Sequence, residues 1–88
     1  MKTLHLTIFG RVQNVNFRTK IWQEAEKHHV KGWVRNSSNI SVVEACLQGR
    51  KEDVEAVITY IRSNPGYVKV EDIKIRETGE RYEHFEIR

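Results

Sequence analysis

Hydrophobic side chains recur with two different spacings along this chain, and the change of spacing predicts where strands and helices lie. Residues Thr3–Phe9 alternate between two sets of side chains, which is typical of a strand with at least one buried face. From Phe17 onward the spacing becomes helical, because large apolar residues recur every three or four positions. We expect this first helix to end near His28 or His29.

The middle of the chain predicts a β-hairpin followed by a second helix. Val30–Arg35 and Ser41–Gln48 have the composition of strands, and the short polar side chains of residues 36–39 favour a turn between them. Residues 54–61 then carry one apolar stripe at helical spacing, behind an acidic start. Pro and Gly in residues 63–66 end that helix.

Two further strands complete the pattern and define a fold class. Val68–Glu77 alternates well enough for a strand, and Tyr82–Ile87 predicts a short closing strand after a turn. The order is therefore β, α, β, β, α, β with a short extra strand. Two helices with one apolar stripe each must cover one face of one antiparallel sheet, which is the α+β, ferredoxin-like α/β sandwich. Eighty-eight residues suffice for one core, so we expect one domain over residues 1–88.

Charge and composition limit the partners and the location. The 15 Lys+Arg against 12 Asp+Glu give a net charge of +3, which attracts small anions but is too low for a nucleic-acid partner. No apolar run reaches the roughly 18 residues of a membrane span, and the first residues lack an export pattern, so we expect a cytoplasmic monomer without membrane contact. Cys46 is the only cysteine, so an internal disulfide is excluded.

Candidate chemistry lies in the loop Gly10–Arg18, between the first strand and the first helix. Such a connection directs several backbone N–H groups and the positive end of the helix dipole at one point, which favours an anion. Asn14 and Asn16 tolerate left-handed backbone angles, and Arg18 presents two donors that match two phosphoryl oxygens. Arg11 is a second, less well placed cation. On the residues alone, an ordinary turn with solvated arginines is an equally open interpretation.

A second candidate group is Asn36, at the end of the segment Lys31–Asn36. Its carboxamide carries an acceptor and two donors, so it can hold a water and contact a phosphoryl oxygen at the same time. The residues alone leave open whether Asn36 is simply a residue of the hairpin turn.

At these two segments the sequence resembles the acylphosphatases. Residues 10–18, GRVQNVNFR, are similar to the family signature G-R-V-Q-G-V-x-F-R, and residues 32–36, GWVRN, to its signature G-W/Y-V-x-N. Gln48–Gly49, Asn64–Gly66 and Phe85–Ile87 follow in the family's order. The resemblance implies a hydrolase without metal or cofactor that splits small acyl phosphates into carboxylate and phosphate.

The resemblance also implies the roles of individual residues. Arg18 would bind the phosphoryl group and Asn36 would position the attacking water. A good leaving group makes positioning and charge stabilisation sufficient, and the substrate's own phosphoryl oxygen can accept the proton of the water. The rest of the substrate-binding cradle would come from the amides of Arg11, Val12, Gln13, Asn14, Val15 and Asn16.

The chain departs from the family pattern in the loop and in the hairpin. Asn14 stands where the signature commonly has glycine, and Asn39–Ile40 replaces the common Asp-Gly turn. The segment from Asn36 to Gly49 is one residue longer than usual, which predicts a bulge at Val42–Val43. We expect these changes to affect the rate more than the fold, and a non-catalytic phosphate or acyl-phosphate binding module is the alternative function.

Two other kinds of site are not favoured by the residues. His28 and His29 are adjacent and lack the i, i+4 spacing of paired metal ligands, so we expect no metal. The βαββαβ order invites comparison with RNA-binding domains, but residues 41–48 contain no aromatic side chain on which a base could stack. Trp22 and Trp33 are therefore interpreted as packing residues.

Overall fold

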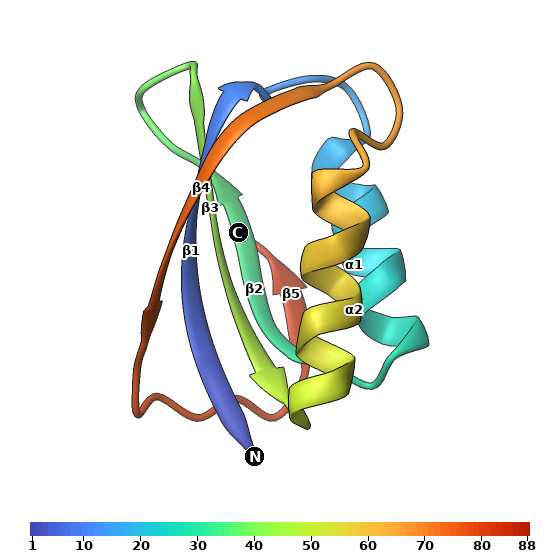
Figure 1. Ribbon diagram of the computed structural model, residues 1–88, viewed down its shortest axis with the longest axis vertical. Helices are drawn as coiled ribbons and strands as arrows, with labels where there is room; N and C mark the ends of the chain where they lie inside the picture. The colour runs from blue at the N-terminus through green and yellow to red at the C-terminus, as the bar shows by residue number, and fades with distance from the viewer.

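The computed structural model describes residues 1–88 and has two layers, a five-stranded sheet and two helices that cover one of its faces (Figure 1). The predicted order of strands and helices is confirmed. The elements are β1 (Lys2–Arg11), α1 (Phe17–Lys27), β2 (Lys31–Asn36), β3 (Val42–Gly49), α2 (Lys51–Arg62), β4 (Lys69–Glu77) and β5 (Phe85–Ile87).

The strands lie in the order β4-β1-β3-β2-β5. β1 pairs antiparallel with β3 and β4, and β2 pairs antiparallel with β3, whereas β5 runs parallel to β2. The prediction of an antiparallel sheet is therefore wrong at its last strand. After β4 the chain crosses the end of the sheet to the opposite edge before it turns back, as Figure 1 shows, and β5 then follows the direction of β2.

The predicted bulge at Val42–Val43 is also wrong. β3 keeps an unbroken register with both neighbours, since Val43 pairs with Ile8 on one side and with Asn36 on the other. The irregular connection of residues 37–41, between the end of β2 and the start of β3, therefore contains the extra residue.

A bulge occurs instead where β1 leaves β4. Phe9 is opposite Asp72 but Gly10 is opposite Val70, so Glu71 has no partner in β1. Gly10 has a φ of 136°, and a Cβ at this position would collide with the carbonyl oxygen of Lys69. A glycine is required here because only glycine combines that φ with so close an approach of two backbones.

The core lies between the sheet and the helices. The predicted stripes are buried, with Phe17, Ile21 and Ala25 facing inward from α1 and residues 54–61 supplying four side chains from α2. These residues and the inward-facing side chains of the sheet form one cluster of 18 buried residues. The apolar spacing read from the sequence is thus the spacing that the core uses. Neither helix is long and apolar enough to cross a membrane.

Candidate active site

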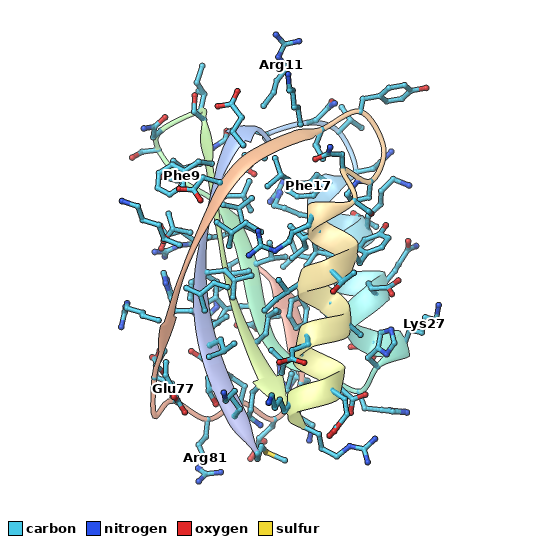
Figure 2. The ribbon with its side chains drawn as sticks, viewed as in Figure 1. Phe9, Arg11, Phe17, Lys27, Glu77 and Arg81 are labelled. Atoms are coloured by element: carbon cyan, nitrogen blue, oxygen red, sulfur yellow. The ribbon has the colours of Figure 1, made fainter.

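The ends of β1 and β2 bring the two candidate segments to one end of the molecule. Both strands are antiparallel to β3, so they run in the same direction and their C-terminal ends lie at the same end of the sheet. Arg11 ends β1, Asn36 ends β2, and α1 begins at Phe17 beside them. Figure 2 shows Arg11 at this extremity, with Phe17 at the adjacent start of the helix.

Gln13 ties the loop of residues 11–16 to the hairpin that follows Asn36. Its Nε2 donates to three carbonyl oxygens, those of Ser37 at 2.7 Å, Asn39 at 2.9 Å and Val42 at 2.9 Å. One amide group has only two protons, so the three contacts share them. A single side chain therefore holds both halves of the candidate site in register. The signature motif includes this glutamine, but sequence reasoning assigned only its backbone amide a role.

Several backbone amides of the loop are free to bind an anion. The N–H groups of Val12, Gln13 and Asn16 have no acceptor within the protein. The N–H of Asn14 donates to the carbonyl of Val12 at 3.1 Å, and that of Val15 donates to the side-chain Oδ1 of Asn14 at 2.7 Å. Since unpaired amides require water or a ligand, the three free groups are the available part of the predicted cradle.

The left-handed backbone angle occurs at Asn16 and not at Asn14. Asn16 has a φ of 73° and precedes α1, and its carbonyl accepts the N–H of Lys20 at 2.8 Å. Asn16 thus adopts the left-handed conformation that asparagine tolerates, whereas Asn14 does not. Asn14 instead uses its side chain to bond the next backbone amide, a local contact that Asn readily makes in a turn.

Arg18 lies in the first turn of α1 and faces β5. Its Nη1 is 3.5 Å from the carbonyl oxygen of Arg88, a long contact. One turn further along the helix, the indole N–H of Trp22 donates to the carbonyl of Phe85 at 3.2 Å, so this stripe of α1 runs along β5. Trp22 thus packs as predicted, although 37% of it stays exposed. Most donors of Arg18 remain free for a ligand.

The last residue of the chain, Arg88, contacts both Arg18 and the strand that ends at Asn36. The N–H of Arg88 donates to the carbonyl of Val34 at 2.8 Å, and Asn36 is two residues, about 7 Å, further along β2. Asn36 and the buried Val34 leave the same face of β2, the face that α1 covers. The Asn36 side chain is exposed and makes no hydrogen bond within the protein, so both ends of its carboxamide are available.

The remaining predicted residues contribute unequally. Arg11 is exposed and points outward from the end of the molecule, away from both layers (Figure 2). Val12 is completely buried and Val15 is 81% exposed, so neither side chain is directed at an anion. Arg11 and Arg18 form none of the protein's six ion pairs. Their charges are therefore uncompensated, which favours a negative ligand at this end.

Two surface hollows lie away from the loop, and no metal cluster is present. One hollow of about 190 Å³ includes Glu26 and His84, and one of about 210 Å³ lies on the sheet face opposite the helices. The Nε2 of His28 lies 3.1 Å from the carboxylate Oε2 of Glu24, which accepts the hydrogen bond. No group of three or more His, Cys, Asp or Glu side chains is arranged to hold a metal ion. The candidate site is thus a shallow surface of backbone amides and cationic side chains at one end of the molecule, and not a deep cavity.

Comparisons with known proteins identify the family. The acylphosphatase family model matches residues 4–87. An acylphosphatase of Thiobacillus denitrificans is 47% identical over 88 residues, which are 100% of this chain and 98% of that relative. The crystal structure of an acylphosphatase from Bacillus subtilis superposes with a TM-score of 0.92 at 28% identity and covers 100% of this chain and 99% of its own. Full-length HypF, solved in a phosphate- and nucleotide-bound form, superposes with a TM-score of 0.89 at 34% identity over 99% of this chain but only 12% of HypF.

The fold, the loop and these relatives agree, and the chain belongs to the acylphosphatase family. It is a hydrolase that splits the carboxyl-phosphate bond of acyl phosphates. The ferredoxin-like fold predicted from the sequence is confirmed, with the fifth strand as its addition.

Proposed function

We propose that Arg18, Asn36 and the amides of residues 11–16 perform this hydrolysis. Arg18 binds two phosphoryl oxygens of the substrate with its planar guanidinium. The free N–H groups of Val12, Gln13 and Asn16, together with the positive end of α1, bind the remaining charge. The observation that carries this assignment is the clamp of Gln13, which holds the amide-rich loop against the hairpin beside Asn36.

Asn36 positions the attacking water in this proposal. Its carbonyl oxygen accepts one proton of the water and its amide donates to a phosphoryl oxygen, and both groups are free in the protein. The water oxygen forms a bond to phosphorus while the bond between phosphorus and the acyl oxygen breaks. One proton of the water passes to a phosphoryl oxygen of the substrate and the other stays on the attacking oxygen, so the products are a carboxylate and dihydrogen phosphate.

Positioning and electrostatics account for the rate without a protein base. A carboxylate is a good leaving group, and phosphoryl transfer passes through a state whose charge lies on the peripheral oxygens. Fixed amides and one arginine stabilise that charge without reorganising. Neither a metal ion nor a cofactor is needed for this sequence of steps.

One observation favours a slower enzyme. The side chain of Asn14 accepts the N–H of Val15, so one amide of the cradle is engaged before a substrate arrives. In the extreme case the loop would bind phosphate without turnover, which is the alternative of a non-catalytic module. Close similarity to acylphosphatases over the full chain favours hydrolysis.

The proposal also covers the domain organisation, the oligomeric state, the partners and the location of the enzyme. Residues 1–88 act as a single acylphosphatase-like domain and a monomer, in agreement with one core shared by both helices and the sheet. Its partner is a small acyl phosphate rather than a nucleic acid or a membrane, and its place is the cytoplasm, where the unpaired Cys46 stays reduced. Size-exclusion chromatography with light scattering would contradict the monomer by a mass of twice 10.4 kDa.

Hydrolysis of benzoyl phosphate by the wild-type protein, Arg18→Ala and Asn36→Ala tests the site. We expect each variant to lose at least about a thousandfold in kcat/KM, since each removes a group that acts on the transition state. Arg81→Ala is the matched control, because Arg81 is an exposed arginine at the end of the molecule opposite Arg11 (Figure 2). Full activity in either site variant would overturn its role.

A phosphate-dependent thermal shift separates binding from catalysis. Hydrolysis with a shift that disappears in Arg18→Ala supports the enzyme, whereas a shift without any hydrolysis identifies a binding module. Loss of activity in Arg81→Ala as well would show that the assay reports folding rather than the site.

A further inference from the structure

The face of the sheet opposite the helices carries a second group of cations. Residues of β1 and β4 that point to this face are direct cross-strand partners, Thr7 with Lys74 and His5 with Arg76. Their neighbours Leu6 and Ile8 point the other way, into the core. The side chains of these two cross-strand pairs therefore stand side by side on an uncovered surface.

A hollow of about 210 Å³ lies between these side chains. It is lined by His5, Thr7, Lys74, Ile75 and Arg76. A single water needs only about 10–15 Å³ of such space, so the hollow accommodates a small molecule of several non-hydrogen atoms. It is also larger than the hollow beside His84, which measures about 190 Å³.

The two cations of the hollow are not neutralised. Lys74 and Arg76 form none of the protein's ion pairs. The nearest carboxylate on β3, Glu44, contacts His5 at 3.2 Å and Arg35 at 3.4 Å. Two positive charges thus flank an open hollow whose neighbouring acid already has partners.

The other groups around the hollow are compatible with an anion. The carboxylate of Asp72, next to Lys74 on the same face of β4, accepts the N–H of Ile73 at 2.9 Å. Thr7 adds a hydroxyl donor that no other group of the protein uses. The ammonium of Lys74 lies 5.5 Å from the centre of the Phe9 ring, a weak contact that it can leave for a ligand.

From this arrangement we infer that the hollow is a second oxyanion site, which binds the phosphoryl group of a small phosphorylated molecule. Lys74 supplies a point charge, Arg76 a planar pair of donors and Thr7 a hydroxyl, a set that matches the several acceptor oxygens of a tetrahedral dianion. Ile75 lies between Lys74 and Arg76 in β4, but it pairs with Leu6, so its side chain points to the other face of the sheet.

This site is separate from the catalytic loop. Thr7 precedes Arg11 by four residues, about 13 Å along β1, and the hollow opens on the face that the helices do not cover. The two anions can therefore bind at the same time, and the second site does not depend on the roles proposed for Arg18 and Asn36.

Titration with inorganic phosphate, followed residue by residue in amide NMR spectra at constant pH and ionic strength, tests the inference. We expect two independent groups of shifted amides, one in residues 10–18 and one around Thr7 and Lys74. The double variant Lys74→Gln/Arg76→Gln should weaken binding at the second group at least about fivefold and leave the first unchanged, because it removes charge but little volume.

Two controls make the result decisive. Lys27→Gln removes an exposed lysine of α1 on the other layer, and both groups of shifts should persist (Figure 2). Chloride at the same ionic strength should leave Thr7 and its neighbours unshifted. Equal shifts with chloride, or an unchanged response in the double variant, would overturn the second site.

Discussion

The loop end and the open face of the sheet both present unpaired cations, but they are built differently. The loop of residues 10–18 presents unpaired backbone amides and one arginine, and apart from Val12 and Phe17 its residues are not buried. The open face is a set of cross-strand side chains on a rigid sheet, several of them buried among one another. Changes in the loop should therefore alter activity with little cost in stability, whereas changes on the open face should do the reverse.

The open face also anchors the chain as it crosses to β5. The indole N–H of Trp33 donates to the hydroxyl of Tyr82 at 2.9 Å, and the guanidinium of Arg88 lies 5.0 Å from the centre of the Trp33 ring. The carboxamide of Gln48 bonds the backbone of Tyr82 twice, at 2.6 Å and 3.1 Å. Trp33 is a packing residue as predicted, but it packs on this face and not in the core between the layers.

Among the variants that compare the two regions, Arg18→Lys should have the largest effect on kcat/KM, and it separates the charge of Arg18 from its geometry. Arg18→Lys keeps the charge and loses the planar pair of donors, so kcat/KM should fall about a hundredfold. Its unfolding free energy should stay within about 0.5 kcal/mol of the wild type, because Arg18 makes only one long contact at 3.5 Å. Benzoyl phosphate kinetics and urea unfolding measure the two quantities. A matching loss of stability would remove the distinction between the two regions.

Removal of the Gln13 side chain should lower both the unfolding free energy and kcat/KM. Gln13→Ala leaves the carbonyl of Ser37 without a donor and removes one of the two donors to the Val42 carbonyl, so we expect about 1–2 kcal/mol of lost stability. The loop and the hairpin beside Asn36 lose their common register, and kcat/KM should fall about tenfold. Gln23→Ala, an exposed glutamine of α1, is the control. Wild-type kinetics in Gln13→Ala would show that the clamp does not position the site.

On the open face, Tyr82→Phe should change stability alone. It removes the acceptor of the Trp33 indole N–H, and the expected loss is about 1 kcal/mol. kcat/KM should remain within about twofold, because Tyr82 touches no residue of the loop. Urea unfolding and benzoyl phosphate kinetics check both statements, and a large loss of activity would contradict the comparison.

The pH dependence of that variant provides a further check. Burial raises the pKa of Tyr82 from 10.0 to about 12, although the N–H of Trp33 partly opposes this shift. A raised pKa means that the folded protein prefers the protonated phenol, so this contribution is complete below pH 10 and is lost as the pH rises toward about 12. The stability gap between wild type and Tyr82→Phe should narrow over that interval, and thermal unfolding measured across it would show a constant gap if the explanation is wrong.

The smallest expected effect is an increase in kcat/KM. Asn14→Gly removes the side chain that accepts the Val15 N–H and frees that amide for the substrate, so kcat/KM should rise about two- to fivefold. Ser38→Gly, in the exposed hairpin, controls for added backbone freedom. A fall in kcat/KM would indicate that the Asn14 contact shapes the cradle instead of blocking it.

Much of the fold could be predicted because its signals are local. The period of two in β1 and the period near 3.6 in α1 and α2 follow from which side chains the core buries. The loop 10–18 and Asn36 could be predicted as candidate site residues because each lies in a short, continuous sequence motif. The need for glycine at position 10 follows from the approach of the carbonyl of Lys69, a residue far away in the sequence.

The sequence by itself determined the elements, their order and the residue types of the loop 10–18, because these depend on neighbours along the chain. Only the tertiary structure decided the direction of β5, the bulge at Glu71 and the partners of Gln13, because each depends on residues far apart in sequence. Asn14 shows the same division. An asparagine at this position is typical of a turn. Only the folded loop shows that the Asn14 side chain, and not a left-handed backbone conformation, stabilises the turn.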